Sequence, residues 1–123
     1  MKLVNIKETY DVVYKDKNVA KEKQAVFTLR RLSASEVNSI DDEITVSKGD
    51  ASFAYLGGTA SRMKIDIALV DWKNIENDDG KEVPCNGLAK ELLPSIVQQF
   101  LVKRIDEDNG LRKTKDTEKK AKN

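Results

Sequence analysis

An acidic turn before Gly80 has the residue types of a calcium site. The stretch reads E-N-D-D-G over residues 76–80. An EF-hand loop needs oxygen ligands at positions 1, 3 and 5, glycine at position 6 and glutamate at position 12. With Gly80 as the sixth position, the first is Ile75 and the twelfth is Asn86, and neither supplies the carboxylate that the loop requires. The spacing therefore predicts a solvated turn and no metal site.

A lone cysteine and a glycine pair are the other candidates for chemistry. Cys85 is the only cysteine and the chain has no histidine. The thiol therefore has no imidazole base, and neither an internal disulfide nor a Cys/His zinc site can form. Gly57-Gly58-Thr59 could bind an anion at a helix start, but no phosphate-loop or dinucleotide pattern surrounds it. We expect a non-enzymatic protein without catalytic residues, cofactor or metal.

The charge distribution argues against a nucleic-acid or membrane partner. The net charge is +1, so no global field favours phosphate groups. Arg30-Arg31 follow Phe27, but an RNA-binding sheet exposes several aromatic side chains, and the spacing of the three Phe and three Tyr here buries most of them. No apolar run approaches the roughly 20 residues that span a bilayer. With its single cysteine and no signal-peptide pattern, the chain is expected in a reducing cytoplasm.

Composition and hydrophobic spacing predict an α+β fold, in which a small antiparallel sheet from the N-terminal half packs with C-terminal amphipathic helices. Residues 1–111 are interpreted as one globular domain and residues 112–123 as a basic disordered tail, with six basic and two acidic side chains. Residues 9–14 (T-Y-D-V-V-Y) are rich in β-formers, and residues 25–32 alternate apolar and polar. We expect these two stretches to pair as an antiparallel hairpin.

The middle of the chain carries one clear signal and one ambiguous stretch. Ser33-Ala-Ser-Glu36 matches a capping box, which predicts a short helix over residues 34–43. Residues 44–47 and 51–56 have β-like composition, and Gly57-Gly58 predicts a break with Thr59 as the next cap. Residues 60–72 alternate like a strand but have the length and cap of a helix. A helix is favoured, and a strand stays open.

The only tryptophan, Trp72, ends this stretch and is expected to be buried and structural. It follows several large aliphatic residues, and an indole contributes several kcal/mol when it leaves water, at roughly 25 cal/mol per Å². The polar residues 73–80 then predict a surface turn. Val83-Pro84 predicts an extended return, because the residue before proline avoids the helical region.

Residues 86–106 form the clearest helical region. Pro94 lies inside it, and proline fits only a first turn, so we expect a short turn over residues 86–93 and a main helix over residues 94–107, ended by Asn109-Gly110. Leu92, Leu93, Ile96 and Phe100 are assigned to the core.

A second group of apolar residues lies beside this stripe at four-residue spacing: Val97, Leu101 and Ile105. The core of a domain this small is not expected to bury both groups of residues. These three residues are therefore the expected partner-binding surface, for other copies of the chain in a homo-oligomer or for a helical protein partner.

Four stretches of the chain carry a resemblance to a known family: F-T-L-R-R-L-S-A-S-E (residues 27–36), A-L-V-D-W-K-N-I (68–75), D-D-G-K-E-V-P (78–84) and L-L-P-S-I-V-Q-Q-F-L-V-K-R-I (92–105). In this order they resemble small bacteriophage proteins of the tail module, in particular tail assembly chaperones. The resemblance covers about half of the chain. Its pattern favours an aromatic residue after the proline, where this chain has Cys85.

The resemblance implies a non-enzymatic protein of the host bacterial cytoplasm that binds the tape measure protein, the long helical protein around which tail tube subunits polymerise. It implies Leu92, Ile96 and Phe100 as contacts to that protein, if the core does not bury them. Two alternatives remain open. One is a structural subunit of the tail or head–tail junction that stays in the virion. The other is a small host-directed binding module.

Overall fold

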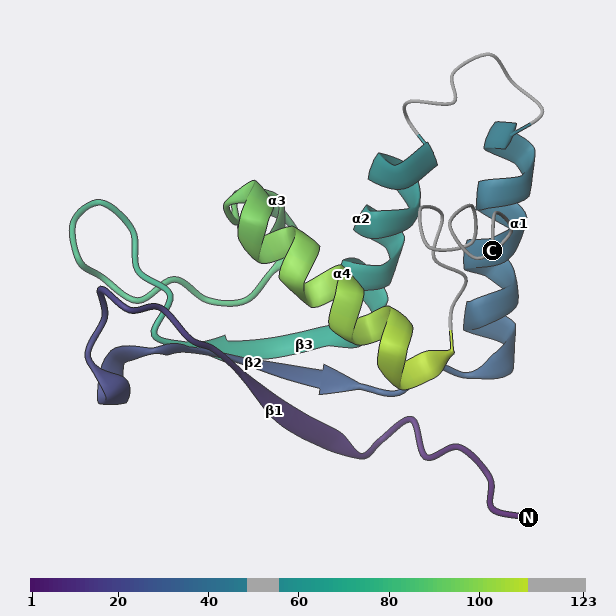
Figure 1. Ribbon diagram of the computed structural model, residues 1–123, viewed down its shortest axis with the longest axis horizontal. Helices are drawn as coiled ribbons and strands as arrows, with labels where there is room; N and C mark the ends of the chain where they lie inside the picture. The colour runs from purple at the N-terminus through teal and green to yellow at the C-terminus, as the bar shows by residue number, and fades with distance from the viewer. Residues whose placement is uncertain (49–55, 111–123) are drawn as a thin grey trace, which may run out of the picture.

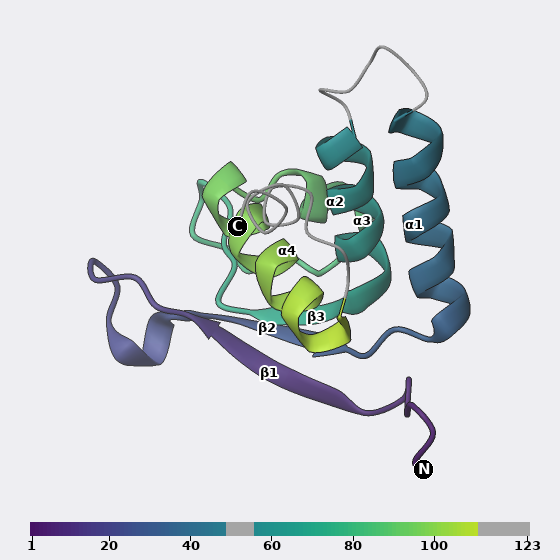
Figure 2. The same ribbon diagram turned by 45° about the vertical axis from the view of Figure 1, so that its right-hand side comes forward.

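The structure is a computed structural model that describes residues 1–48 and 56–110. Its elements in chain order are β1 (Thr9–Tyr14), the 3-10 turn η1 (Lys21–Lys23), β2 (Ala25–Arg30), α1 (Ala34–Lys48), α2 (Leu56–Ala68), β3 (Leu69–Lys73), α3 (Gly87–Glu91) and α4 (Ser95–Asn109). The strands form one antiparallel sheet in the order β1-β2-β3. The helices lie on one side of this sheet (Figures 1 and 2). The expected α+β class is confirmed.

The predicted hairpin is confirmed, with β2 ending at Arg30. The strands pair regularly, so that Val12 lies opposite Phe27, and on the other side of β2 Phe27 lies opposite Trp72 of β3. These three side chains are all buried. Successive strand residues point to opposite faces, so this row faces the helices. The third strand falls at the end of the stretch 60–72, for which a helix was favoured and a strand stayed open.

One hydrophobic cluster holds the described elements together. Phe27 and Leu29 from the central strand, Ile40 from α1, and Leu101 from α4 are all fully buried in it. This cluster lies between the helices and the side of the sheet that faces them. A small sheet needs such packing on at least one face to be stable.

The capping box at the start of α1 is confirmed. The Glu36 backbone N–H donates to Ser33 Oγ at 3.2 Å, and the Ser33 N–H donates to Glu36 Oε1 at 2.9 Å. Arg30, at the end of β2, also donates to both Glu36 oxygens, at 2.9 and 2.5 Å. These bonds, led by that from Arg30, lower the pKa of Glu36 from 4.5 to about 2. The cap therefore joins the sheet to the first helix.

This network predicts an acid-dependent loss of stability. A carboxylate whose folded pKa is lower than its unfolded pKa stabilises the fold above the unfolded value and loses that contribution as pH falls through the folded value. For Glu36 the window runs from pH 4.5 down to about 2. We expect the melting temperature of the Glu36→Gln variant to depend less on pH across this window than that of the native chain. Thermal melts by circular dichroism measure it, and parallel pH profiles would contradict the assignment.

α1 is longer than expected. It continues to Lys48, so the strand expected at residues 44–47 is wrong. No glycine or proline occurs between Ser33 and Lys48, so nothing in the local sequence ends the helix. The β-like stretch at residues 51–56 lies almost wholly outside the described residues.

The ambiguous stretch 60–72 divides into a helix and a strand. α2 ends at Ala68 and β3 begins at Leu69. Ala60, Lys64 and Ala68 are buried at the spacing of a helix, whereas Leu69 and Trp72 are buried against β2. The expected break at Gly57-Gly58, with Thr59 as cap, is wrong, because α2 begins at Leu56 and includes all three residues.

The segment after β3 folds back on the sheet. Trp72 is 6% exposed, and its indole N–H donates to the Val83 carbonyl oxygen at 2.6 Å. The expected burial of Trp72 is confirmed. The acidic turn is closed by Asn77, whose Oδ1 accepts from the backbone N–H groups of Asp79 and Lys81 at 2.9 and 3.0 Å.

The end of α4 also follows the expectation. Gly110 adopts a φ of 63°, which is the left-handed conformation that glycine tolerates at a helix C-terminus. The tail expected at residues 112–123 lies outside the described residues. Within residues 1–48 and 56–110, no helix combines the length and apolar character needed to cross a bilayer.

Candidate partner-binding surface

The two C-terminal helices are set by local chemistry around a break at Pro94. Asn86 Oδ1 accepts from the Ala89 N–H at 2.9 Å and so caps α3. Pro94 has an extended ψ of 145° and stands as the N-cap of α4. Gln98 Nε2 donates to the Leu93 carbonyl oxygen at 2.8 Å across this break. The expected short turn followed by a main helix is confirmed, with the helical bounds Gly87–Glu91 and Ser95–Asn109.

The residues expected to bind a partner lie in the core instead. Val97 is 9% exposed, and Leu101 and Ile105 are 0% exposed. With Ala89 and Leu93 they form a continuous buried series at four-residue spacing, which packs towards α2. The expectation that Val97, Leu101 and Ile105 form a partner-binding surface is wrong, because this face of α4 closes the core.

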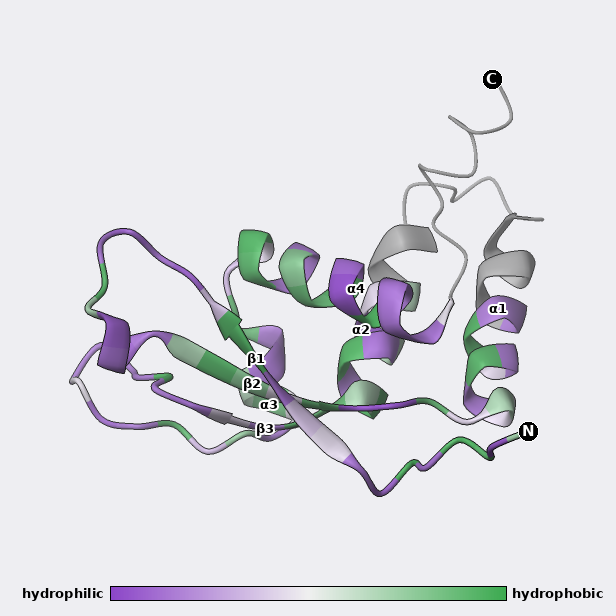
Figure 3. Cartoon of the chain, turned by 60° about the horizontal axis from the view of Figure 1, so that its bottom comes forward, coloured by the Kyte–Doolittle hydropathy of each residue, from purple (hydrophilic) through white to green (hydrophobic). Residues whose placement is uncertain are grey.

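The exposed apolar surface is the neighbouring series, which we call the aliphatic stripe: Leu88, Leu92 and Ile96. These side chains are 70%, 76% and 65% exposed. Two of them, Leu92 and Ile96, were expected in the core. Figure 3 shows that the first turns of α4 are hydrophobic and its last turns largely hydrophilic. Single exposed leucines are common, but here three large aliphatic side chains are exposed within residues 88–96, on both sides of the break at Pro94.

The sequence itself indicates which of the two apolar series is buried. The series that starts at Ala89 stays apolar through Ile105, whereas the series that starts at Leu88 continues to Phe100 and then reaches Arg104. A stripe that buries a full-length helix must be apolar throughout. Phe100 accordingly is only partly buried, and its ring packs edge-on against Tyr14 with centroids 5.1 Å apart.

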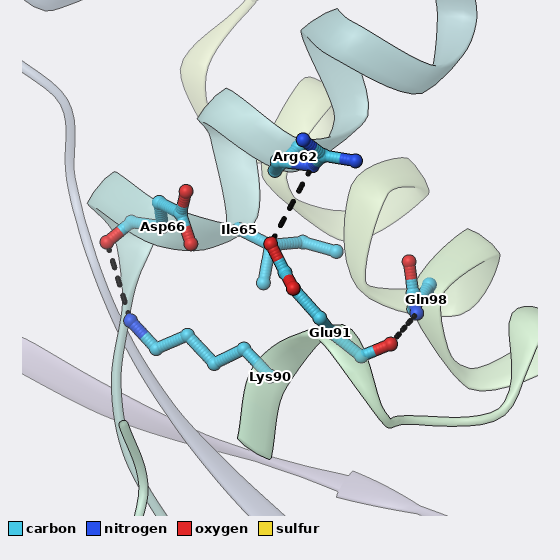
Figure 4. Close-up of a pocket in the computed structure, with 6 residues that line it drawn as sticks. All are labelled: Arg62, Ile65, Asp66, Lys90, Glu91 and Gln98. Carbon is cyan, nitrogen blue, oxygen red and sulfur yellow. Dashed lines mark hydrogen bonds and ion pairs between the residues drawn. The ribbon is translucent and has the colours of Figure 1, made fainter. Parts of the chain in front are cut away.

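A polar cavity lies beside the stripe, between α2, α3 and the start of α4 (Figure 4). Its volume is about 190 Å³, below the roughly 300 Å³ at which ligand pockets begin. Its polar groups are engaged with one another: Lys90 Nζ donates to the Asp66 carbonyl oxygen at 3.2 Å, and Arg62 pairs with Glu91 at 3.9 Å. The two contacts across this cavity link α2 to α3.

Cys85, Tyr10 and Asp108 carry the other potentially reactive side chains, and their contacts are structural. Burial raises the pKa of the Cys85 thiol, which makes it a weaker nucleophile at neutral pH. The Tyr10 hydroxyl donates to Asp108, and burial together with this bond raises the pKa of Tyr10. Arg104 also donates to the Asp108 carboxylate, at 3.2 Å. These hydrogen bonds of Asp108 connect the end of α4 to β1.

The acidic side chains do not gather into a metal site in the part of the chain that the structure describes. No group of three or more His, Cys, Asp or Glu residues there could hold a metal ion. In the acidic turn, Glu76 and Glu82 face each other across a single β-bridge, and Gly80 supplies the positive φ of 77° that the turn needs. Besides the bonds to the Asn77 side chain, two backbone hydrogen bonds close the turn: the Asn77 N–H donates to the Lys81 carbonyl oxygen and the Gly80 N–H to that of Asn77.

The described residues thus form a small α+β fold with an exposed aliphatic stripe on α3 and α4. Comparisons with protein-family models, with curated proteins and with solved structures find no match for this chain. What it does must therefore be inferred from its own residues.

Proposed function

We propose that this protein is a non-enzymatic phage morphogenesis protein, a tail assembly chaperone that binds the tape measure protein through the aliphatic stripe. The observation that carries the proposal is the exposure of Leu88, Leu92 and Ile96, each at least 65%. Water contact with three large aliphatic side chains is unfavourable by roughly 25 cal/mol per Å². A partner that covers them recovers this free energy.

An apolar helix is the partner that such a stripe fits. An amphipathic helix can lay its apolar face on exposed aliphatic side chains such as these. An unassembled tape measure protein is long and helical and exposes apolar stripes that would aggregate. Three aliphatic contacts give weak binding, and a chaperone that must leave during assembly needs weak contacts repeated along its client.

The resemblance described above supports the phage setting. Its stretches include the end of β2 with the α1 cap, β3 with Trp72, the acidic turn, and α4. The first two meet in the core, where the Phe27 and Trp72 rings are edge-on with centroids 6.4 Å apart. A protein of this kind acts in the host cytoplasm. A virion subunit and a host-directed binding module are the alternatives.

A charge placed on the stripe tests the proposal. We expect Ile96→Lys to reduce the amount of a tape measure protein that stays soluble on co-expression by about tenfold, and to leave the melting temperature within a few degrees of the native value, because Ile96 is 65% exposed. Gln99→Lys is the matched control, since Gln99 is an exposed residue of the same helix.

Two outcomes would contradict the chaperone proposal. One is equal solubility of the client with the native chain and with Ile96→Lys. The other is stoichiometric recovery of this protein in purified virions, measured by quantitative mass spectrometry, which would favour a structural subunit. Capture of a host protein that depends on Ile96, with no tape measure protein bound, would favour the host-directed module.

A further inference from the structure

The two edges of the sheet differ in how they are protected. At the β3 edge, the pairing with β2 shifts register at Thr28/Leu29, and the Trp72 backbone N–H is taken by the Asp71 side chain at 2.8 Å. Residues 82–85 lie beside β3, where Val83 accepts from the Trp72 indole. Bulges, charges and covering segments are the means by which proteins block an edge strand. The β3 edge has all three.

The β1 edge is less protected in the described residues. β1 pairs with β2 over six residues without a shift, and its sequence, T-Y-D-V-V-Y, contains no proline or glycine and a single charge, Asp11. Its outer side is bordered by no other strand or helix in Figures 1 and 2. Such a strand offers a row of backbone donors and acceptors to another chain.

α4 packs over the helix-facing side of β1 and forms a groove with this strand. The Tyr10 hydroxyl contacts Asp108 near the end of α4, and Tyr14 packs on Phe100 near its start, so α4 runs antiparallel to β1. The groove has a volume of about 450 Å³ and is lined by residues 11–15 together with Phe100 and Arg104. A strand that pairs with β1 would close the open wall of this groove.

We infer that the occupant of this edge is β1 of a second copy, paired antiparallel about a twofold axis so that two sheets become one of six strands. This surface is separate from the aliphatic stripe and goes beyond the proposed function. A twofold axis perpendicular to the sheet keeps both helix layers on the same side. It also makes the contact isologous, so that it closes at a dimer.

The charges on β1 select one register. With Val13 opposite Val13 of the second copy, Asp11 lies opposite Lys15 twice, once on each side of the axis. Opposite charges directly across strands stabilise pairing. Val13, which is 45% exposed, is then covered. In the two neighbouring registers Val13 faces Asp11 or Lys15 instead. The strand is therefore complementary to itself in one register.

A charge-exchange cycle tests the register in the full chain. Asp11→Lys or Lys15→Asp alone places like charges opposite each other twice, and we expect each to weaken dimerisation at least about tenfold in sedimentation velocity runs over a range of protein concentrations. The double variant restores both pairs and should restore dimerisation. Rescue by the double variant distinguishes an ion pair between copies from loss of the bond that Thr28 Oγ1 donates to Asp11 within one copy.

Cross-linking provides an independent readout. In a Cys85→Ser background, Val13→Cys should form an intermolecular disulfide under mild oxidation, because opposed residues have Cβ atoms roughly 4.5–5.5 Å apart. Asp11→Cys, on the same face of the same strand, is the matched control and should not cross-link to itself in this register. A native chain that sediments as a monomer at all concentrations overturns the inference. A double variant as weak as the single ones, or cross-linking through position 11 in preference to position 13, also overturns it.

Discussion

Replacing Trp72 by alanine is expected to lower the free energy of unfolding by about 3–5 kcal/mol, the range seen when large buried aromatic side chains are truncated. The indole is 6% exposed, packs edge-on against Phe27 with ring centroids 6.4 Å apart, and donates to the Val83 carbonyl oxygen at 2.6 Å. Its removal leaves a cavity in the core and a carbonyl group without its donor. A domain of this size has a total stability of about 5–15 kcal/mol, so the variant is expected to be partly unfolded at 37 °C.

Urea denaturation followed by circular dichroism measures this effect, because Trp72 is the only fluorescent indole in the chain. Val70→Ala is the matched control. Val70 belongs to the same strand but is 42% exposed, so its truncation should cost well under about 1 kcal/mol. If the two variants are equally stable, Trp72 does not anchor the return of residues 82–85 to the sheet.

The second large effect is expected at the buried ion pair between α2 and α4. Lys64 Nζ lies 2.7 Å from Asp106 Oδ1, and the two side chains are 6% and 7% exposed. Removing one member of such a pair leaves the other charge in an apolar environment, which costs about 3–5 kcal/mol. We therefore expect Lys64→Met to destabilise the fold by that amount in urea denaturation.

The double variant Lys64→Met, Asp106→Leu tests whether the stability lost in Lys64→Met comes from the unpaired charge or from altered packing. Apolar replacement of a whole buried pair is often neutral, so most of the lost stability should return. Arg62→Met is the matched control on the same helix, because Arg62 and Glu91 are 3.9 Å apart and 68% and 52% exposed. Exposed pairs of this kind contribute about 0–1 kcal/mol. A double variant no more stable than Lys64→Met would show that this ion pair is not the source of the effect.

The sequence by itself determined the elements whose causes are local. The β-formers of residues 9–14 and 25–30, the Ser33–Glu36 cap, the restart at Pro94 and the end at Gly110 each follow from one or two neighbouring residues. The burial of Trp72 follows from its size. These predictions succeed because backbone conformation, capping and transfer from water depend little on distant parts of the chain.

Tertiary structure decided everything for which the local sequence offered two answers. Residues 60–72 could be helix or strand, and pairing with β2 made Leu69–Lys73 a strand. Gly57-Gly58 disfavours a helix only by about 1 kcal/mol per residue, so α2 could include both.

The candidate binding surface depended on tertiary structure most of all. Two apolar series run side by side along α4, and one buried face admits only one of them. The face that packs against α2 carries Ile105 and also Asp106, the partner of Lys64. This packing places Val97 and Leu101 in the core and leaves Ile96 in water. A shift of one residue turns a helix by about 100°, so the same sequence pattern yields a different surface once the contacts of α2 are known.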